Sequence, residues 1–310
     1  MSIPVEAWSA VPLASSVAFG LLAPPMSRRL PPRAATWLLS AGSVLLATSS
    51  VAVLGLIVVS VAGALPVVAW LGHWSAARVA AIEPFDPKTA MVAAAGLLVE
   101  ACLSGWVAWR RGRRLLAAWS ACRACASPLV VLPDRSPHAF ALPGWPGRIV
   151  ATTGLLEACT AEERRAVLAH EQAHLDARHD LHLAAVAIAA ALDPALARVP
   201  RAARLASERW ADESAARATG DRRVVADAIG RVARVRPPAD GMFAALPFGA
   251  SHAEQRVLAL LRRPPRLRAV PAGVLAGLGV AAGLSALVAA HDIAQVFEAA
   301  RRVSLVVTGR

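Results

Sequence analysis

Residues 170–174 read His-Glu-Gln-Ala-His, an H-E-x-x-H motif within a stretch whose pattern predicts an α-helix. On a helix, His170 and His174 project from one face because they are four residues apart, and Glu171 lies beside them. Two neutral imidazoles in this arrangement can bind one Zn²⁺ ion, and the carboxylate can take a proton from water at that metal. The motif is typical of zinc hydrolases and sets the first expectation for fold and function.

The sequence around the motif predicts a helix that packs on a core. Thr160 and Glu163 have the spacing of a capping box, which opens a helix about ten residues before the histidines. Val167, Leu168 and Leu175 then form an apolar stripe. This context favours a functional zinc site over a chance match on a solvated helix.

A catalytic zinc needs a third protein ligand, which leaves one position for water. Glu208 is the best candidate, since it opens an E-x-x-x-D element that ends at Asp212, in a second helical segment. The two carboxylates share a helix face, so Glu208 can bind the metal while Asp212 accepts the ring N–H of a ligating histidine. Small residues at positions 211, 215 and 216 would let this helix approach the first one closely.

Other interpretations of these residues stay open at this point. Glu208 and Asp212 could simply face solvent among nearby arginines. His179 and His182 are rival ligands. His179 would point off the metal face of a continuous helix, because it lies five residues beyond His174.

Composition places much of the chain in a lipid bilayer. Hydrophobic residues make up 56% of the 310 residues and aromatic residues only 5%, a profile of Ala-, Leu- and Val-rich membrane helices. Candidate spans lie at about residues 3–23, 36–61, 90–109 and 270–290. The second has an apolar extension to Leu71, and we expect Pro66 to bend or end it. The apolar segment 181–192 is too short to cross and is expected to be buried or interfacial.

Arginine clusters orient these spans. They lie at 28–33, 110–114 and 262–268, and all three fall on one side if the N-terminus is outside. By the positive-inside rule that side is the cytoplasm, so we expect the zinc segment to be cytoplasmic. The N-terminus lacks a basic region, and the first span is therefore expected to be retained. A net charge of +12 fits anchors at an anionic leaflet better than nucleic-acid binding, because no nucleic-acid motif accompanies it.

Two further features carry weaker signals. Cys122 and Cys125 form a C-x-x-C without a second pair, so small buried residues on a helix are favoured over a zinc or redox site. Glu100 lies inside the third span, where a carboxylate must be protonated, paired or near water. It is either part of a sensing or substrate path or hydrogen-bonded to hydroxyls such as Ser43 or Thr48 of the second span.

The chain changes character between the third span and the motif helix. Residues 129–132 and 148–152 are predicted strands, and 143–147 form a turn between Phe140 and Ile149. A strand just before an H-E-x-x-H helix commonly binds an extended substrate in zinc proteases, and a purely structural hairpin is the alternative.

Several of these segments together resemble the BlaR/MecR-type membrane metallopeptidases and are also similar to the HtpX and CAAX-prenyl endopeptidase group. The segments are Ala139–Gly144, Arg148–Val150, Gly154–Leu156, Glu162–Glu171 and Glu208–Glu213. The likeness covers roughly residues 128–260, and the pattern of three spans before the domain and one after it is similar to BlaR/MecR. The resemblance implies zinc ligands His170, His174 and Glu208, with Glu171 as the general base.

The chain departs from the proteins it resembles in two respects. Only about 20 residues follow the fourth span, so we expect the extracellular penicillin-binding sensor of BlaR/MecR, and antibiotic sensing through it, to be absent. The chain also has no tyrosine, which excludes a complete Tyr/His pair at the oxyanion. His252 resembles the histidine of a Thr-His-Pro segment in the HtpX-like group and could supply that donor; a surface histidine at a helix start is the alternative.

These observations predict a mostly α-helical, polytopic membrane protein of about four transmembrane helices, with a cytoplasmic α+β zincin-like metalloprotease domain. The expected parts are a membrane domain with its linker (1–127), the protease domain (128–265) and the fourth span with a short tail (266–310). We expect a Zn²⁺-dependent endopeptidase of the cell membrane that cuts a protein or peptide, such as a transcriptional repressor, in regulated proteolysis. The alternatives are quality control of membrane proteins and a catalytically silent scaffold, against which the presence of Glu171 argues.

Overall fold

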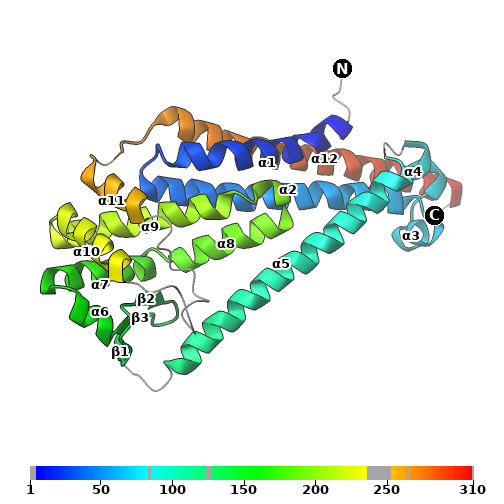
Figure 1. Ribbon diagram of the computed structural model, residues 1–310. Helices are drawn as coiled ribbons and strands as arrows, with labels where there is room; N and C mark the ends of the chain where they lie inside the picture. The colour runs from blue at the N-terminus through cyan, green and yellow to red at the C-terminus, as the bar shows by residue number, and fades with distance from the viewer. Residues whose placement is uncertain (1–4, 83–84, 123–126, 236–252, 264, 309–310) are drawn as a thin grey trace.

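The structure, a computed structural model, describes residues 5–82, 85–122, 127–235, 253–263 and 265–308 (Figure 1). Within these residues four helices are long and apolar enough to cross a membrane. They are α1 (Val5–Ser27), α2 (Pro32–Gly63), α5 (Pro87–Ala121) and α12 (Ala269–Thr308). The predicted fold class is confirmed, since the chain is mainly helical, with these candidate spans and one small mixed sheet.

The second span is shorter than the apolar run in its sequence. Helix α2 ends at Gly63, and Pro66 begins a separate short helix, α3 (Pro66–Gly72). Proline suits the first turn of a helix, because the backbone N–H that it lacks would have no partner there. The Gly63 carbonyl accepts a hydrogen bond of 2.9 Å from the indole of Trp74, just before α4 (Ala76–Ile82). The apolar extension to Leu71 is therefore a helix of its own.

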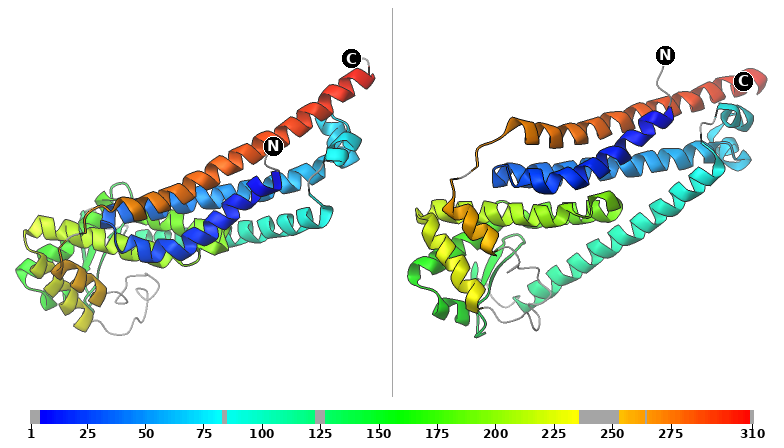
Figure 2. Two further views of the ribbon diagram at one scale, coloured as in Figure 1. Left: turned by 90° about the horizontal axis from the view of Figure 1, so that it is seen from above. Right: turned by 45° about the horizontal axis from the view of Figure 1, so that its top comes forward.

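Helices α1, α2 and α12 run side by side, while α5 diverges from them toward the sheet (Figures 1 and 2). Small residues allow close approach of the three helices. Gly42 of α2 lies against the Phe19 ring of α1, and an added Cβ there would come within 2.7 Å of a ring carbon. Small residues packed against large ones are a common way for membrane helices to associate.

The sheet has the strand order β1–β3–β2, with β1 (Leu129–Leu132), β2 (Ala139–Leu142) and β3 (Arg148–Thr152). Strands β1 and β3 are parallel, and β2 is antiparallel to β3, with Phe140 opposite Val150. The predicted strands 129–132 and 148–152 are confirmed, and β2 is an additional strand. Strand β3, which is the last strand before the motif region in the sequence, is therefore the central strand. Strand β2 lies at the edge of the sheet, beside the motif helix.

Further helices follow the sheet in the chain, and some of them pack on the sheet and others on the spans. They are α6 (Thr153–Ala158), α7 (Ala161–Asp176), α8 (His179–Leu192), the 3₁₀ turn η1 (Pro194–Leu196), α9 (Val199–Thr219), α10 (Arg222–Val235) and α11 (Ala253–Leu261). Helix α7 begins with the predicted capping box, in which Thr160 and Glu163 each accept a hydrogen bond from the other's backbone N–H. The Glu163 carboxylate also binds Arg231 of α10 at 2.7 Å, which ties α10 to the start of the motif helix.

The hairpin formed by α8, η1 and α9 is inserted among the membrane helices. Val186, Leu196 and Val199 of this hairpin share one buried core with Phe19 of α1 and Leu39 of α2. The apolar segment 181–192, which the sequence predicts to be buried or interfacial, packs against the spans α2 and α5.

Two contacts fix the tip of this hairpin. The Ala195 carbonyl lies directly against Gly20 of α1, which leaves no room for a Cβ atom at that glycine. The Asp193 carboxylate accepts hydrogen bonds from the Ser50 hydroxyl of α2 at 2.9 Å and from the Ala195 backbone N–H at 3.1 Å. Ser50 lies near the middle of α2, so the hairpin reaches well into the membrane bundle.

Candidate metal centre

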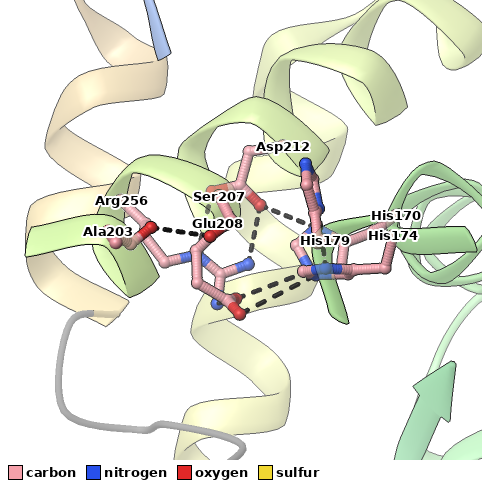
Figure 3. Close-up of polar contacts among 8 residues, drawn as sticks. All are labelled: His170, His174, His179, Ala203, Ser207, Glu208, Asp212 and Arg256. Carbon is pink, nitrogen blue, oxygen red and sulfur yellow. Dashed lines mark hydrogen bonds and ion pairs between the residues drawn. The ribbon is translucent and has the colours of Figure 1, made fainter. Parts of the chain in front are cut away.

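Helices α7 and α9 bring together the three residues that the sequence assigns to a metal (Figure 3). The Nε2 atoms of His170 and His174 lie 3.1 Å apart, and the Glu208 carboxylate oxygens lie 3.6 Å from the first and 3.7 Å from the second. Two nitrogen ligands about 2.0–2.1 Å from a tetrahedral zinc lie roughly 3.3 Å apart, so this donor set fits one zinc ion. Ala211 and Ala215 are fully buried and allow α9 to lie close to α7.

Asp212 lies one turn after Glu208 and contacts the other ring nitrogen of His170. Its Oδ1 is 2.9 Å from His170 Nδ1, an arrangement that fixes an imidazole with Nε2 toward a metal. Arg256 of α11 completes the cluster, with Nη2 2.6 Å from Asp212 and Nη1 3.0 Å from Glu208. Burial raises the pKa of both carboxyls, but Arg256 and His170 outweigh it and hold each pKa below its ordinary value.

The two histidines differ in their affinity for a proton when no metal is bound. Burial lowers the pKa of His170, but its hydrogen bonds with Asp212 and Glu208 prevail and raise it to about 10. Burial lowers the pKa of His174 to about 4, although Glu208 opposes it. The metal-free site therefore holds a proton on His170, and that proton must leave before both Nε2 atoms can bind a cation.

His179 lies in the site, and the expectation of a continuous helix is wrong here. Helix α7 ends at Asp176, and Arg178 adopts a left-handed conformation with a φ of 49°, so α8 starts in a new direction. The break returns the His179 ring to His174, and their Nδ1 atoms are 2.8 Å apart. With His174 Nε2 directed at a metal, its Nδ1–H would donate to His179. His179 is thus placed to orient a candidate ligand and is not one of the three clustered residues.

His182, the other rival ligand, lies outside the cluster. Its Nδ1 is 2.8 Å from the Ser40 hydroxyl of α2, and its ring meets Trp37 edge-on with centroids 4.5 Å apart. His182 therefore ties α8 to a membrane helix.

Glu171 forms part of the wall of a cavity of about 120 Å³ beside the candidate ligands. The side chain is buried, and its carboxylate accepts a hydrogen bond from the Ala141 backbone N–H of β2. Its Oε2 atom is buried and has no partner among the described residues. Burial raises the pKa of this carboxyl, and the charge of His170 opposes the rise. A buried oxygen without a partner, next to a cavity, is well suited to bind and release a proton.

Three other predicted residues bear on the site less directly. The buried Oε2 of Glu100 has no hydrogen-bond partner in the part of the chain that the structure describes, so the expected bond to a span-two hydroxyl is not formed by this atom. Cys122 is buried at the end of α5. Cys125 and His252 lie outside the described residues, and the role of His252 as an oxyanion donor stays a prediction.

Arg256 is the site residue that sequence reasoning missed. It is nine-tenths buried, and it comes from α11, which no fixed spacing relates to the motif or to Glu208. Its one local signal is its position four residues before the buried Leu260, which places a charged residue on the apolar face of a helix.

The fold and the site together define a membrane protein with a metallohydrolase-type centre, in which two imidazoles and a carboxylate gather beside a buried glutamate. Residues 113–264, just under half of the chain, match the family model of Peptidase family M48. This match supports a zinc metallopeptidase of the M48 family and indicates a peptide hydrolase. The narrower BlaR/MecR-type assignment stays a prediction. No curated protein and no solved structure matches the chain.

Proposed function

We propose that the chain is a zinc-dependent endopeptidase held in the membrane, with His170, His174 and Glu208 as the metal ligands and Glu171 as the general base. The observation that carries this proposal is that Oε2 of Glu171, next to the three clustered residues, has no hydrogen-bond partner within the described part of the chain. A carboxylate that is not needed to hold the metal, and that is buried without a full set of partners, is best explained by chemistry. This argues against a silent scaffold.

The chain's own residues supply the proton transfer and the orientation. Bound zinc would polarise the substrate carbonyl and increase the acidity of water. Glu171, whose pKa is raised by burial, takes a proton from the attacking water and returns it to the leaving amine. Asp212 and His179 hold the two imidazoles at their Nδ1 atoms, so both Nε2 atoms stay directed at one point. Arg256 keeps Glu208 ionised.

The substrate is a protein segment that lies in extended form along β2. The Ala141 N–H of this strand binds Glu171 and Ala139 lines the cavity, so the strand passes beside the reacting groups. Backbone pairing with a strand edge gives affinity with little sequence preference. Val225 and Ile229 of α10 line the same cavity, which therefore fits an apolar substrate side chain near the scissile bond.

The centre lies level with the ends of two candidate spans. Arg209, next to Glu208, donates a hydrogen bond of 3.4 Å to the Arg28 carbonyl in the turn between α1 and α2. The Arg33 guanidinium, near the start of α2, lies 5.7 Å from the centre of the Trp210 ring. We therefore place the scissile bond near the bilayer surface, on the side predicted to be cytoplasmic.

The favoured role is regulated proteolysis of a regulator such as a repressor. Quality control of membrane proteins is the second candidate, and the observation in its favour is that the site lies close to the bilayer surface.

Purified full-length protein should contain about one zinc per chain and cleave an unfolded protein such as casein. Zinc-loaded protein without such activity, tested on several unfolded substrates, would count against the proposal. Proteomes of cells that carry the unmodified or the Glu171→Gln protein separate the two roles. Accumulation of one soluble regulator supports signalling, whereas accumulation of many membrane proteins supports quality control.

A further inference from the structure

A second cavity, of about 400 Å³, lies between α9, α11 and the turn that joins α1 to α2. Four arginines line it: Arg28 from the turn, Arg209 from α9, and Arg262 and Arg263 from the residues that follow α11. No carboxylate is found among the described residues that line this cavity. The residues of the metal centre line a different cavity. The concentration of positive charge indicates an anionic ligand.

The position of this cavity indicates an anionic ligand of the kind found at a membrane surface. Helix α1 ends and α2 begins on either side of Arg28, and α12 begins just after the segment that carries Arg262 and Arg263. Lipid headgroups lie at the ends of membrane helices, and basic pockets there bind their phosphates. Leu205 and Leu258 add apolar surface to the same cavity. A molecule with an anionic head and an apolar body matches both parts.

Arg209 is the most enclosed of the four cations. It is partly buried, whereas the side chains of Arg28, Arg262 and Arg263 are exposed. Burial lowers the pKa of Arg209, while Glu213 and Asp212 raise it. A partly desolvated guanidinium among three others gains strongly from a phosphate, whose oxygens accept its forked N–H donors.

We propose that this cavity binds the phosphate of an anionic phospholipid, with the four guanidinium groups around the phosphate and the first part of the acyl chains against Leu205 and Leu258. A phosphate in this place bridges Arg209 on α9 to the arginines at the end of α11. Helix α9 also carries Glu208, and α11 also carries Arg256. Lipid binding therefore holds α11 where Arg256 contacts the metal centre.

Native mass spectrometry of the delipidated full-length protein tests this directly, with phosphatidylglycerol, phosphatidylcholine or inorganic phosphate as the added probe. We expect one tightly held phosphatidylglycerol per chain. The double variant Arg262→Gln/Arg263→Gln should bind it about 25-fold more weakly, since each arginine beside an anionic headgroup contributes about fivefold. The matched control is Arg266→Gln/Arg268→Gln, which removes the same charge from exposed positions of the same linker outside the cavity and should keep the unmodified affinity.

Three results would overturn the proposal. They are equal losses in the cavity variant and the control, equal binding of phosphatidylcholine, and binding of inorganic phosphate as tightly as phosphatidylglycerol. If the double variant does not fold, Arg28→Gln changes one exposed side chain of the cavity and should weaken binding about fivefold. These measurements need neither zinc nor peptide hydrolysis, so they can fail or succeed independently of the proposed protease function.

Discussion

Nη1 of Arg256 lies 3.0 Å from Oε2 of Glu208, although the two residues come from separate helices. The same Glu208 oxygen is 3.6 Å from Nε2 of His170, so a fixed positive charge stands beside a candidate metal ligand. Arg256 also binds Asp212, and the buried cluster therefore joins two carboxylates to one guanidinium and one protonated imidazole. Such a cluster depends on each of its members, because a buried charge left without its partner is costly.

Replacement of Arg256 by Gln should destabilise the protein by about 3–5 kcal/mol, because Glu208 and Asp212 lose their buried counter-charge. The melting temperature in detergent should fall clearly, and peptide hydrolysis should fall with it. Arg266→Gln, at an exposed position of the linker before α12, is the control and should leave both unchanged. If the Arg256→Gln protein has the same melting temperature as the unmodified protein, this cluster does not hold α11 in place.

Loss of any proposed metal ligand should remove most of the zinc. We expect His170→Ala, His174→Ala and Glu208→Ala each to lower zinc content from about one per chain to near zero, measured by elemental analysis of purified protein. His291→Ala, at an exposed histidine of α12, should retain it. Full zinc occupancy in Glu208→Ala, together with its loss in His179→Ala, would mean that His179 is the third ligand.

Glu171→Gln should separate chemistry from metal binding. The change keeps size and helix propensity but removes the base, so hydrolysis should drop by at least about 10²-fold while zinc content persists. Because Glu171 is buried and burial raises its pKa, a neutral amide removes an unfavourable charge, and the melting temperature should stay the same or rise. Equal hydrolysis by the two zinc-loaded proteins would contradict the assignment of the base.

Zinc affinity should rise with pH. His170 has its pKa raised from 6.5 to about 10 in the folded, metal-free protein, so it is protonated at neutral pH and must release that proton to bind zinc. The apparent association constant should therefore increase about tenfold per pH unit between pH 7 and 9, measured by competition with a chelator.

By the same linkage, protonated His170 stabilises the metal-free fold fully below about pH 6.5, and this contribution is lost as the pH rises through about 10. Asp212→Asn should flatten the pH dependence, because it removes the negative charge that holds the proton.

Membrane orientation rests on the placement of arginines. We predict that the N-terminus lies outside, that residues 110–268 are cytoplasmic and that the C-terminus lies outside. Reporter fusions at Gly112, near His138 and at the C-terminus should report inside, inside and outside. An external signal at His138 would reject both the orientation and a cytoplasmic substrate.

Local signals in the sequence were enough for the spans, the capping box and two of the three strands. Each of these is decided by neighbours in the chain: apolar length for a span, and Thr160 with Glu163 for a helix start. The grouping of His170, His174 and Glu208 also followed from helical spacing within two separate segments, once α7 and α9 were assumed to pack together.

Features that depend on tertiary contacts were not predictable in this way. The left-handed conformation of Arg178 has no sequence signal, since arginine seldom adopts it, yet it is what returns His179 to the site. Arg256 reaches Glu208 across a stretch of chain with no fixed spacing. To predict that α8 and α9 insert among the spans, one must know which apolar helix faces pack together. Composition alone does not give this pairing.

The buried tip of the α8–α9 hairpin also determines how the proposed activity can be lost. Val199 is fully buried against the spans, and it begins the same helix that carries Glu208. The proposed protease domain could not be released as a soluble fragment, because detachment would expose the apolar faces of α8 and displace the helix that carries Glu208, the proposed third ligand. Solvents or detergents harsh enough to separate the spans should therefore abolish activity at the same concentration at which they dismantle the bundle.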